Sequence, residues 1–446
     1  MLLRFIVENL FCFAEETTFS MVATKDDALP KQVMPGLGDR YRVLRTAALY
    51  GANAHGKSKL LEAMKWAQKL IVDGTRTNKK IPVQPFRLDP ELRNKPSRIE
   101  FTILVEGVEY TYGFVVDAER IHEEWLFSRP NAREVKWFER VTDAKLETRI
   151  EVGPALARKG SKDREFVEFL IRGLRANQLF LTEGVERNFK KFEAVYDWFE
   201  KKLHIVSPDG SLLPIAHFLY KSDEFCRAVS EFIGMADTGI AEIGIKRKIS
   251  EVLDVMSKVP DRIRADLEKH LEKGAVLSDE TGMSALFTDQ DGLSELVLVA
   301  KHQSLDGTLV DFEIKDESSG TRRLLQLLPI LFGGLVQEKI FIVDELDRTL
   351  HPALSRFFIE SFVNNTIKRQ LVITTHETSL LDLNLLRRDE IWFVEKDPQG
   401  KAQVYPLSSF KVRPDLRLER GYLQGRFGAI PFIGSPESLG WFEGVE

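Results

Sequence analysis

The sequence predicts an α/β fold, and three apolar runs are the basis for that prediction. One run, Val43–Tyr50, precedes a glycine-containing loop and then a helix-like stretch at Lys59–Leu70. Two others, Ile340–Val343 and Leu371–Thr375, are short and continuous, which is typical of strands buried on both faces of a sheet. Such strands, alternating with helices, indicate a core sheet with flanking helices.

Antiparallel β structure is predicted beside this core. Residues 1–23 alternate in a strand-turn-strand manner, and Ser97–Val105 and Val108–Val116 form an alternating pair around a Glu106-Gly107 turn. From Lys162 to about Lys273 the apolar spacing becomes helical, which predicts an inserted helical unit. The predicted parts are an N-terminal lobe at 1–160 with the loop and the antiparallel β subdomain, a helical subdomain at 161–280, a C-terminal lobe at 281–400 and a tail at 401–446.

Length and composition fit a folded chain of more than one structural unit. The 446 residues are 43% hydrophobic and 29% charged, and they contain no run of about 18 apolar residues. Two cysteines, Cys12 and Cys226, are too few for a disulfide framework and lack metal-ligand spacing. We therefore expect a cytoplasmic protein with no membrane span. The net charge of -5 means that any contact with DNA must come from a local basic patch.

The loop after the first strand has the pattern G-x-x-x-x-G-K-S, from Gly51 to Ser58. Between a strand and a helix this pattern is typical of a phosphate-binding loop, although a chance glycine turn is the alternative for the loop alone. The predicted ATP contacts are Gly51, Asn53, Gly56, Lys57 and Ser58. Lys57 is expected to neutralise the outer phosphates, and Ser58 to supply a hydroxyl ligand to Mg²⁺.

Asp344 and Glu345 directly follow the apolar run Ile340–Val343. Two adjacent carboxylates at the end of a buried strand are unfavourable unless they serve a cation or a water. Asp344 is therefore predicted to hold Mg²⁺, directly or through water, and Glu345 to take a proton from the attacking water. A solvated strand end is the alternative for the pair alone. Together with the loop, the pair predicts binding and hydrolysis of ATP.

Three more features complete an ordered set of five motifs. Ser318 and Gly320 stand at the start of an apolar helix predicted at Arg322–Val336, where a simple helix cap is the alternative interpretation. A Leu-Asp pair ending at Asp347 follows the two acids, and the second buried strand ends in His376.

This order of motifs resembles the ABC-type ATPase head of the structural-maintenance-of-chromosomes, double-strand-break-repair and RecF families. It is most similar to the shorter prokaryotic RloA-like AAA-type ATPases linked to phage defence. The resemblance extends from Leu2 to Phe432. It implies an α/β head with a P-loop core sheet, an antiparallel β subdomain and an inserted helical subdomain.

The resemblance also implies roles for individual residues. Ser318 and Gly320 look like the signature motif, which in such families reaches across a head-to-head dimer to the nucleotide bound by the other subunit. Asp347 looks like the D-loop residue, and His376 like the switch histidine that contacts the same phosphate. Gln84 resembles the Q-loop glutamine that couples Mg²⁺ and water to the helical lobe.

The function expected from these features is an ATP-driven switch. Its catalytic residues would be Lys57, Glu345 and His376, and it would dimerise around nucleotide. Its output would be control of a separate effector, a nuclease or another toxin, in defence against phage. The alternative is a RecF-like ATPase that closes on DNA. An ABC transporter subunit is disfavoured because the inserted unit is large. The inserted helices and the tail around Tyr422–Phe432 are the expected docking surfaces.

Overall fold

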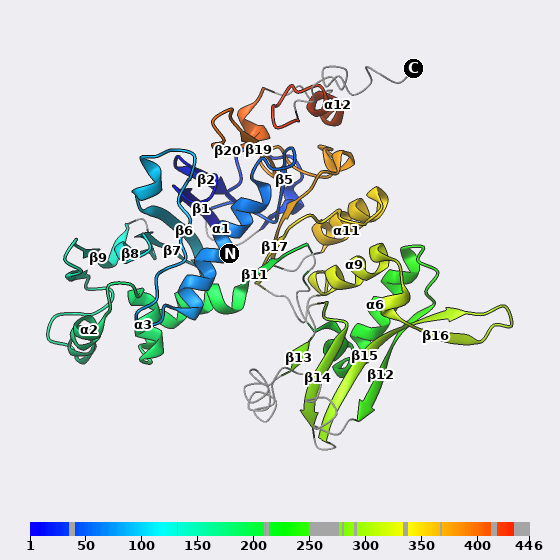
Figure 1. Ribbon diagram of the computed structural model, residues 1–446. Coiled ribbons are helices and arrows are strands. Elements are labelled where there is room, and N and C mark those ends of the chain that lie inside the picture. The colour runs from blue at the N-terminus through cyan, green and yellow to red at the C-terminus, as the bar shows by residue number, and fades with distance from the viewer. Residues whose placement is uncertain are drawn as a thin grey trace, which may run out of the picture. The chain divides into compact units, whose positions relative to one another are not determined.

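The structure is a computed structural model, and it divides the chain into two compact units (Figure 1). Unit 1 comprises Met1–Leu203 and Val372–Glu446, and unit 2 comprises His204–Leu371. The described residues are 1–34, 41–131, 133–208, 210, 214–249, 276–278, 281–289, 292–332, 338–365, 368–411 and 417–431. The predicted division into four parts stays a prediction.

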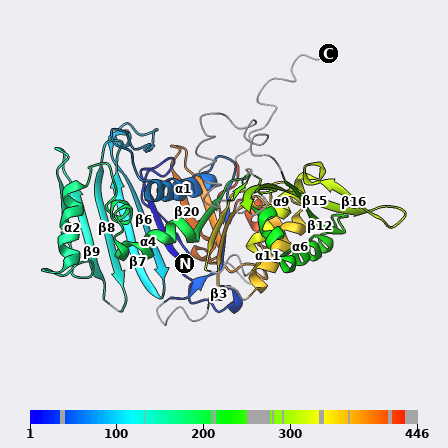
Figure 2. The ribbon, with the colours of Figure 1, turned by 90° about the horizontal axis from the view of Figure 1, so that it is seen from below.

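A seven-stranded antiparallel sheet forms much of unit 1, with the strand order β10-β9-β8-β7-β6-β1-β2. Figure 2 shows β9, β8, β7 and β6 side by side. The predicted hairpin is confirmed, because Val105 pairs with Val108 around Glu106 and Gly107, which have φ of 50° and 80°. The strands are β1 (Leu2–Glu8), β2 (Thr17–Ser20), β6 (Ser97–Val105), β7 (Val108–Val116), β8 (Ile121–Arg129), β9 (Val135–Thr142) and β10 (Thr148–Val152).

Short helices follow this sheet in the chain, and aromatic side chains from the α3 region contact it. They are α2 (Lys162–Gly173), α3 (Phe180–Glu186) and α4 (Glu193–Asp197), which a π-helical turn (Trp198–Lys202) follows. Phe138 of β9 meets Phe180 and Phe192 at centroid distances of 4.9 and 5.7 Å. These contacts bury apolar area on one face of the sheet, so the helices cover that face.

A buried carboxylate joins the sheet to helix α3. Glu124 on β8 accepts hydrogen bonds from the backbone N–H groups of Phe180 and Leu181, at 2.7 and 3.1 Å. The guanidinium of Arg140 lies 3.3 Å from the same carboxylate, and both side chains are fully buried. Burial raises the pKa of Glu124, whereas Arg140 and the two amides oppose that rise.

The phosphate-loop strand lies in the second sheet of unit 1. Strand β5 (Thr46–Tyr50) is buried along its whole length and pairs in parallel with β19 (Ile391–Lys396), which pairs with β20 (Ala402–Pro406). The end of β18 (Gln370–Thr374) lies on the other side of β5. Helix α1 (Lys57–Asp73) follows the loop. A two-stranded sheet of β3 (Val33–Met34) and β4 (Val43–Leu44) precedes β5.

The C-terminal tail is part of the aromatic core of unit 1. After helix α12 (Leu418–Leu423), Phe427 stacks on Phe393 of β19, as does Tyr422, with both centroid distances 5.6 Å. The expectation that the tail is a docking surface is therefore wrong for Tyr422 and Phe427, because both side chains are buried against β19. Phe432 lies outside the described residues.

Unit 2 contains a sheet with the order β12-β15-β14-β13, and β16 also pairs with β15. In Figure 1 the β15–β16 hairpin extends away from the rest of this sheet. Helices α5 (Ile215–Lys221) and α6 (Asp223–Met235) precede it in the chain. The strands are β12 (Glu242–Ile249), β13 (Leu277–Ser278), β14 (Ser284–Asp289), β15 (Gly292–Gln303) and β16 (Leu309–Glu313).

Strand β12 corrects part of the predicted helical stretch. Residues 242–249 have an Ile at every second position except one, and they pair with β15 from Glu242↔Lys301 to Ile249↔Ser294. Residues 242–249 are therefore a strand because they pair with β15, and the prediction of a helix for this segment is wrong. Residues 250–275, the end of the predicted helical stretch, lie outside the described residues.

Unit 2 also contains the strand before the acidic pair and the helices that precede and follow this strand in the chain. The predicted strand is confirmed as β17 (Ile340–Val343), which is fully buried beside β11 (Leu203–Val206). Helix α9 (Ser319–Leu327) is shorter than the predicted helix, since a 3-10 turn containing Pro329 follows it. Helix α11 (Pro352–Asn364) comes after β17. Among the described residues, no helix is long and apolar enough to cross a membrane.

Candidate nucleotide site

Close packing against a neighbouring strand requires the first glycine of the loop. A Cβ on Gly51 would lie 2.3 Å from the carbonyl oxygen of Val394 on β19. Because β5 and β19 are parallel and buried, their spacing cannot widen at low cost. Gly51 therefore lets the chain leave β5 without disturbing the sheet.

The second glycine turns the chain into helix α1. Gly56 is the N-cap of α1 with a φ of 112°, and a Cβ there would lie 2.9 Å from the Sγ atom of Cys12. As a glycine, the N-cap residue has no side chain with which to cap the helix. The first N–H groups of a helix have no intrahelical partner and carry partial positive charge, so this end of α1 suits an anion.

Lys57 and His376 meet beside this loop. The Nζ atom of Lys57 donates to the carbonyl oxygens of Gly51 and Ala52 at 2.7 and 3.2 Å, and it lies 3.0 Å from Nε2 of His376. An ammonium group can only donate, so Nε2 must accept and the ring proton sits on Nδ1. The structure thus brings together the predicted phosphate lysine and the predicted switch histidine.

Two neighbouring side chains add no charge to the loop. Burial lowers the pKa of the His55 imidazole, although a hydrogen bond with the Val394 backbone acts in the opposite direction. His55 is therefore neutral at pH 7. Burial also raises the pKa of the Cys12 thiol, which keeps it protonated. The charge of the loop thus comes from Lys57 and the helix end.

The remaining predicted loop residues are solvent-exposed. Asn53 and Ser58 are exposed, and Ser58 is the second residue of α1. The carbonyl oxygen of Gln84 accepts a hydrogen bond from the Phe11 amide at 2.9 Å, and its side chain is exposed. Within the described part of unit 1, no hydrogen bond joins that side chain to the loop. The Q-loop role of Gln84 stays a prediction.

The acidic pair lies at the end of β17 in unit 2. The amide of Asp344 donates to the Val206 carbonyl of β11 at 3.0 Å, so the strand pairing extends to the first acid. Glu345 has a φ of 47°, a left-handed conformation that is uncommon for a residue other than glycine. The Nη2 atom of Arg323 lies 3.1 Å from the Asp344 carbonyl oxygen and 3.4 Å from that of Glu345. Arg323 thus braces the turn in which the acids lie.

The signature segment packs on the turn that follows the acids. Ser318 caps α9, since its Oγ atom accepts from the Thr321 amide at 3.0 Å, and the cap interpretation is therefore confirmed. A Cβ on Gly320 would lie 2.8 Å from the Thr349 carbonyl oxygen, so a larger residue would push the two segments apart. Asp347 lies in the same turn, where its carbonyl oxygen accepts from the Leu350 amide at 3.0 Å.

Comparison with known families agrees with these features. A family model described as "AAA domain, putative AbiEii toxin, Type IV TA system" matches residues 47–382, which is more than half of the chain. The chain belongs to this AAA-domain family. The match begins in β5, passes through the loop and the acidic pair, and ends after His376. No curated protein matches the chain.

Solved structures provide weaker similarities. The SMC head domain from Thermotoga maritima is 12% identical to this AAA-domain chain, with a TM-score of 0.37, and the match covers 92% of this chain and 99% of that one. An SmcHead bound to the C-winged helix domain of ScpA is also 12% identical, with a TM-score of 0.41 and coverage of 91% and 97%. Similarities at this level assign neither site residues nor partners.

Sequence reasoning missed Arg323. This AAA-domain chain has two arginines, Arg322 and Arg323, directly after the signature segment, and Arg323 is buried on the side of α9 that carries leucines. A charged residue among buried leucines needs a polar partner, which is the signal that could have identified it. Its partners, the Asp344 and Glu345 carbonyls, become visible only in the fold.

The residues present suit ATP with Mg²⁺. The start of helix α1 and the ammonium of Lys57 provide backbone donors and one positive charge for phosphate oxygens. No group of three His, Cys, Asp or Glu side chains able to hold a metal occurs in the described ranges. A Mg²⁺ ion held by one or two protein oxygens, phosphate oxygens and water needs no such group.

Proposed function

We propose that this AAA-domain protein is an ABC-type ATPase switch that binds and hydrolyses ATP with Mg²⁺. The observation that carries this proposal is the buried Lys57 ammonium, which lies at the start of helix α1 and 3.0 Å from His376. A lysine and a histidine in this position can both contact the outermost phosphate of a nucleotide. The family match, which includes both residues, supports the same conclusion.

Each predicted residue has a proposed task. Lys57 neutralises the outer phosphates while the loop amides bind their oxygens. Ser58 and Asp344 would hold Mg²⁺, and the ion would supply positive charge for phosphoryl transfer. Glu345 accepts a proton from the attacking water, and His376 orients that water or the terminal phosphate.

We also propose that two copies complete each other's sites. In this arrangement Ser318, Gly320 and Asp347 of one subunit face the nucleotide that the other subunit binds. The support is the placement of Ser318 and Gly320 at the exposed start of α9, with Gly320 required by its contact to Thr349. Closure of the dimer around ATP would then move the two ATPase subunits relative to one another. Such a movement is how a switch of this type transmits a signal.

Mixing two inactive variants tests this arrangement. Ser318→Asp keeps the helix cap but places negative charge against the phosphate, and Lys57→Ala removes the phosphate lysine. Each variant alone should be inactive. An equimolar mixture should recover roughly a quarter of wild-type turnover, because half the dimers are mixed and each mixed dimer has one intact site.

The matched control is Ser222→Asp, which changes another capping serine at the start of α6 and should leave turnover unchanged. The mixture must be shown to contain mixed dimers. If such a mixture recovers no turnover, the proposal that each site is shared between two subunits and that the two sites act independently would be contradicted.

We propose that the output of the switch is control of a separate effector, a nuclease or another toxin, in defence against phage. The family description refers to a putative toxin and a toxin–antitoxin system, which supports a link to a toxic activity. The family match does not favour the RecF-like alternative. Two free cysteines, Cys12 and Cys226, fit our proposal of a reducing cytoplasm.

The purified chain should leave DNA and RNA intact in the presence of ATP and Mg²⁺. In cells, the ATP-locked Glu345→Gln variant should retain a specific partner protein that Lys57→Ala does not retain. Cleavage of nucleic acid by the purified wild-type chain, lost in Asp344→Ala, would show instead that the chain is itself the effector.

A further inference from the structure

We propose that His302 is a positioning residue for the signature segment, because it holds Glu317, the residue that directly precedes Ser318. His302 lies on β15, Ser318 is the N-cap of α9, and all three residues belong to unit 2. This role of His302 rests on the proposed function, in which Ser318 faces a nucleotide. His302 would act through Glu317 and would not touch the nucleotide itself.

The imidazole of His302 donates a hydrogen bond to Glu317. Its Nε2 atom lies 2.7 Å from the Oε1 atom of the carboxylate, and a carboxylate can only accept. The side chains of His302 and Glu317 are 28% and 11% exposed, so water competes little for either group. A hydrogen bond to a charged and mostly buried acceptor is stronger than one at the surface. The contact therefore fixes where the Glu317 side chain lies.

His302 is itself held by its neighbours in the sheet. It pairs with Val310 of β16, and its ring meets the ring of Phe312 edge to face, at a centroid distance of 5.0 Å. The preceding residue, Lys301, pairs with Glu242 of β12. The imidazole is thus attached to a sheet of adjacent strands and serves as a fixed anchor for Glu317.

The chain from this sheet to the signature segment is short. Strand β16 ends at Glu313, a 3-10 turn covers Ile314–Asp316, and Ser318 begins α9 as its cap. The backbone amide of Glu317 donates to the carbonyl oxygen of Ile314 at 3.2 Å. Because a planar peptide unit joins Glu317 to Ser318, a change in the backbone angles of Glu317 moves the cap residue with it. Holding the Glu317 side chain therefore restricts the position of Ser318.

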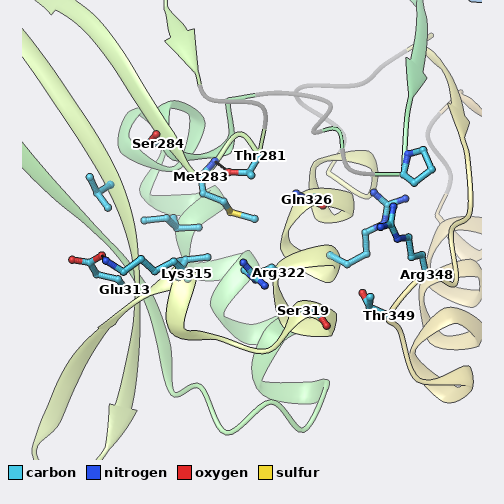
Figure 3. A pocket seen from close by; sticks show the side chains of 15 residues that line it. Thr281, Met283, Ser284, Glu313, Lys315, Ser319, Arg322, Gln326, Arg348 and Thr349 are labelled. Atoms are coloured by element: carbon cyan, nitrogen blue, oxygen red, sulfur yellow. Dashed lines mark hydrogen bonds and ion pairs between the residues drawn. The ribbon is translucent and has the colours of Figure 1, made fainter. Parts of the chain in front are cut away.

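Packing supports this turn on only part of its surface. A cavity of about 570 Å³ lies beside α9, and Ile314, Lys315 and Ser319 are among its lining residues. Figure 3 shows the connection, from Glu313 and Lys315 at one end to Ser319 at the other. Atoms that face a cavity lack packing partners on that side. The hydrogen bond from His302 supplies a restraint that packing on the cavity side does not.

Two substitutions separate this hydrogen bond from the packing of the ring. His302→Phe keeps an aromatic ring against Phe312 but has no donor for Glu317, whereas His302→Gln offers an amide N–H in place of Nε2. His302→Phe should lower ATP turnover by about tenfold or more, because a small displacement of a group that contacts the reacting phosphate is costly. His302→Gln should stay within about threefold of wild type, since it restores a donor. Phosphate release at saturating ATP measures both.

Mixed dimers show whether His302 acts through the signature segment. A chain with an intact phosphate loop is combined with a roughly tenfold excess of a Lys57→Ala chain, so that about nine in ten intact loops lie in mixed dimers. With His302→Phe placed on the Lys57→Ala chain, the altered signature segment faces the intact loop. Turnover should then fall at least about threefold relative to the same mixture without His302→Phe. With His302→Phe placed on the other chain, an unaltered signature segment faces the intact loop, and turnover should not change.

His122→Phe is the matched control. The Nε2 atom of His122, on β8 of unit 1, lies 2.6 Å from the Oδ2 atom of Asp117, so this variant removes a similar contact far along the chain from the signature segment. It should leave turnover unchanged in the unmixed protein and in both mixtures.

Wild-type turnover in unmixed His302→Phe protein would overturn the proposal. An equal loss in the two mixtures would also overturn it, because a general loss of folding follows the substitution onto either chain. If the wild-type chain mixed with Lys57→Ala lacks the turnover expected of mixed dimers, the proposed sharing of sites fails. The comparison of unmixed His302→Phe with His302→Gln then still decides the role of His302, and an equal loss in these two variants would overturn it.

Discussion

Replacing Glu345 by Gln is expected to preserve ATP binding and to slow ATP turnover by about 10²- to 10⁴-fold, the usual contribution of general-base catalysis. The substitution removes the proton acceptor but changes the size of the side chain very little. Glutamine also has no greater difficulty than glutamate in adopting the left-handed backbone at this position, where φ is 47°. Phosphate release under saturating ATP and direct nucleotide binding would give the two quantities.

Two other variants make this result interpretable. Lys57→Ala should abolish binding as well as turnover, because it removes the charge that faces the phosphates and the hydrogen bonds to Gly51 and Ala52. Glu360→Gln, which changes a half-buried carboxylate on α11, should leave both quantities at the wild-type level. Turnover close to wild type in Glu345→Gln would rule out Glu345 as the base.

Replacing Glu124 by Ala is expected to destabilise unit 1 by about 3–5 kcal/mol, the usual cost of leaving a buried charge without its partner. The change removes the acceptor for two amides at the start of α3 and leaves the buried Arg140 guanidinium without its carboxylate. Denaturant unfolding followed by tryptophan fluorescence would measure the loss as a lower midpoint.

The adjacent residue provides a close control for this prediction. Glu123 lies on the same strand but is exposed, so Glu123→Ala should change the free energy of unfolding by no more than about 0.5 kcal/mol. Combining Glu124→Leu with Arg140→Met should restore most of the stability, since an apolar pair of similar volume needs no charge balance. An unchanged midpoint in Glu124→Ala would mean that the ion pair does not hold α3 on the sheet.

The motifs of the candidate site could be predicted because their physics is local. The strand before the loop, the helix after it and the strand Ile340–Val343 are defined by apolar runs and by the glycines that follow or separate them. The hairpin was predicted because its two alternating strands flank a turn that needs positive φ at both central residues. The α/β class follows from these elements, and it is confirmed by the parallel pairing of β5 with β19 and by the antiparallel sheet.

Other features depend on residues that are far apart in the sequence. Lys57 and His376 are separated by 319 positions, so only the pairing of their strands in one sheet brings Nζ within 3.0 Å of Nε2. Tyr422 and Phe427 looked like tail residues open to a partner, but their contact with Phe393 makes them core. Burial is a property of the folded surroundings, and no local pattern in the tail records it.

By itself, the sequence determined the phosphate loop, the acidic pair and the α/β class, because each depends on residues within about one element of one another. The tertiary structure alone decided that Arg323 braces the acidic turn, that β12 is a strand, and that a cavity lies beside α9. Each of these features depends on a partner segment that is distant in the sequence and is positioned by long-range packing. A short stretch of sequence carries no information about such contacts.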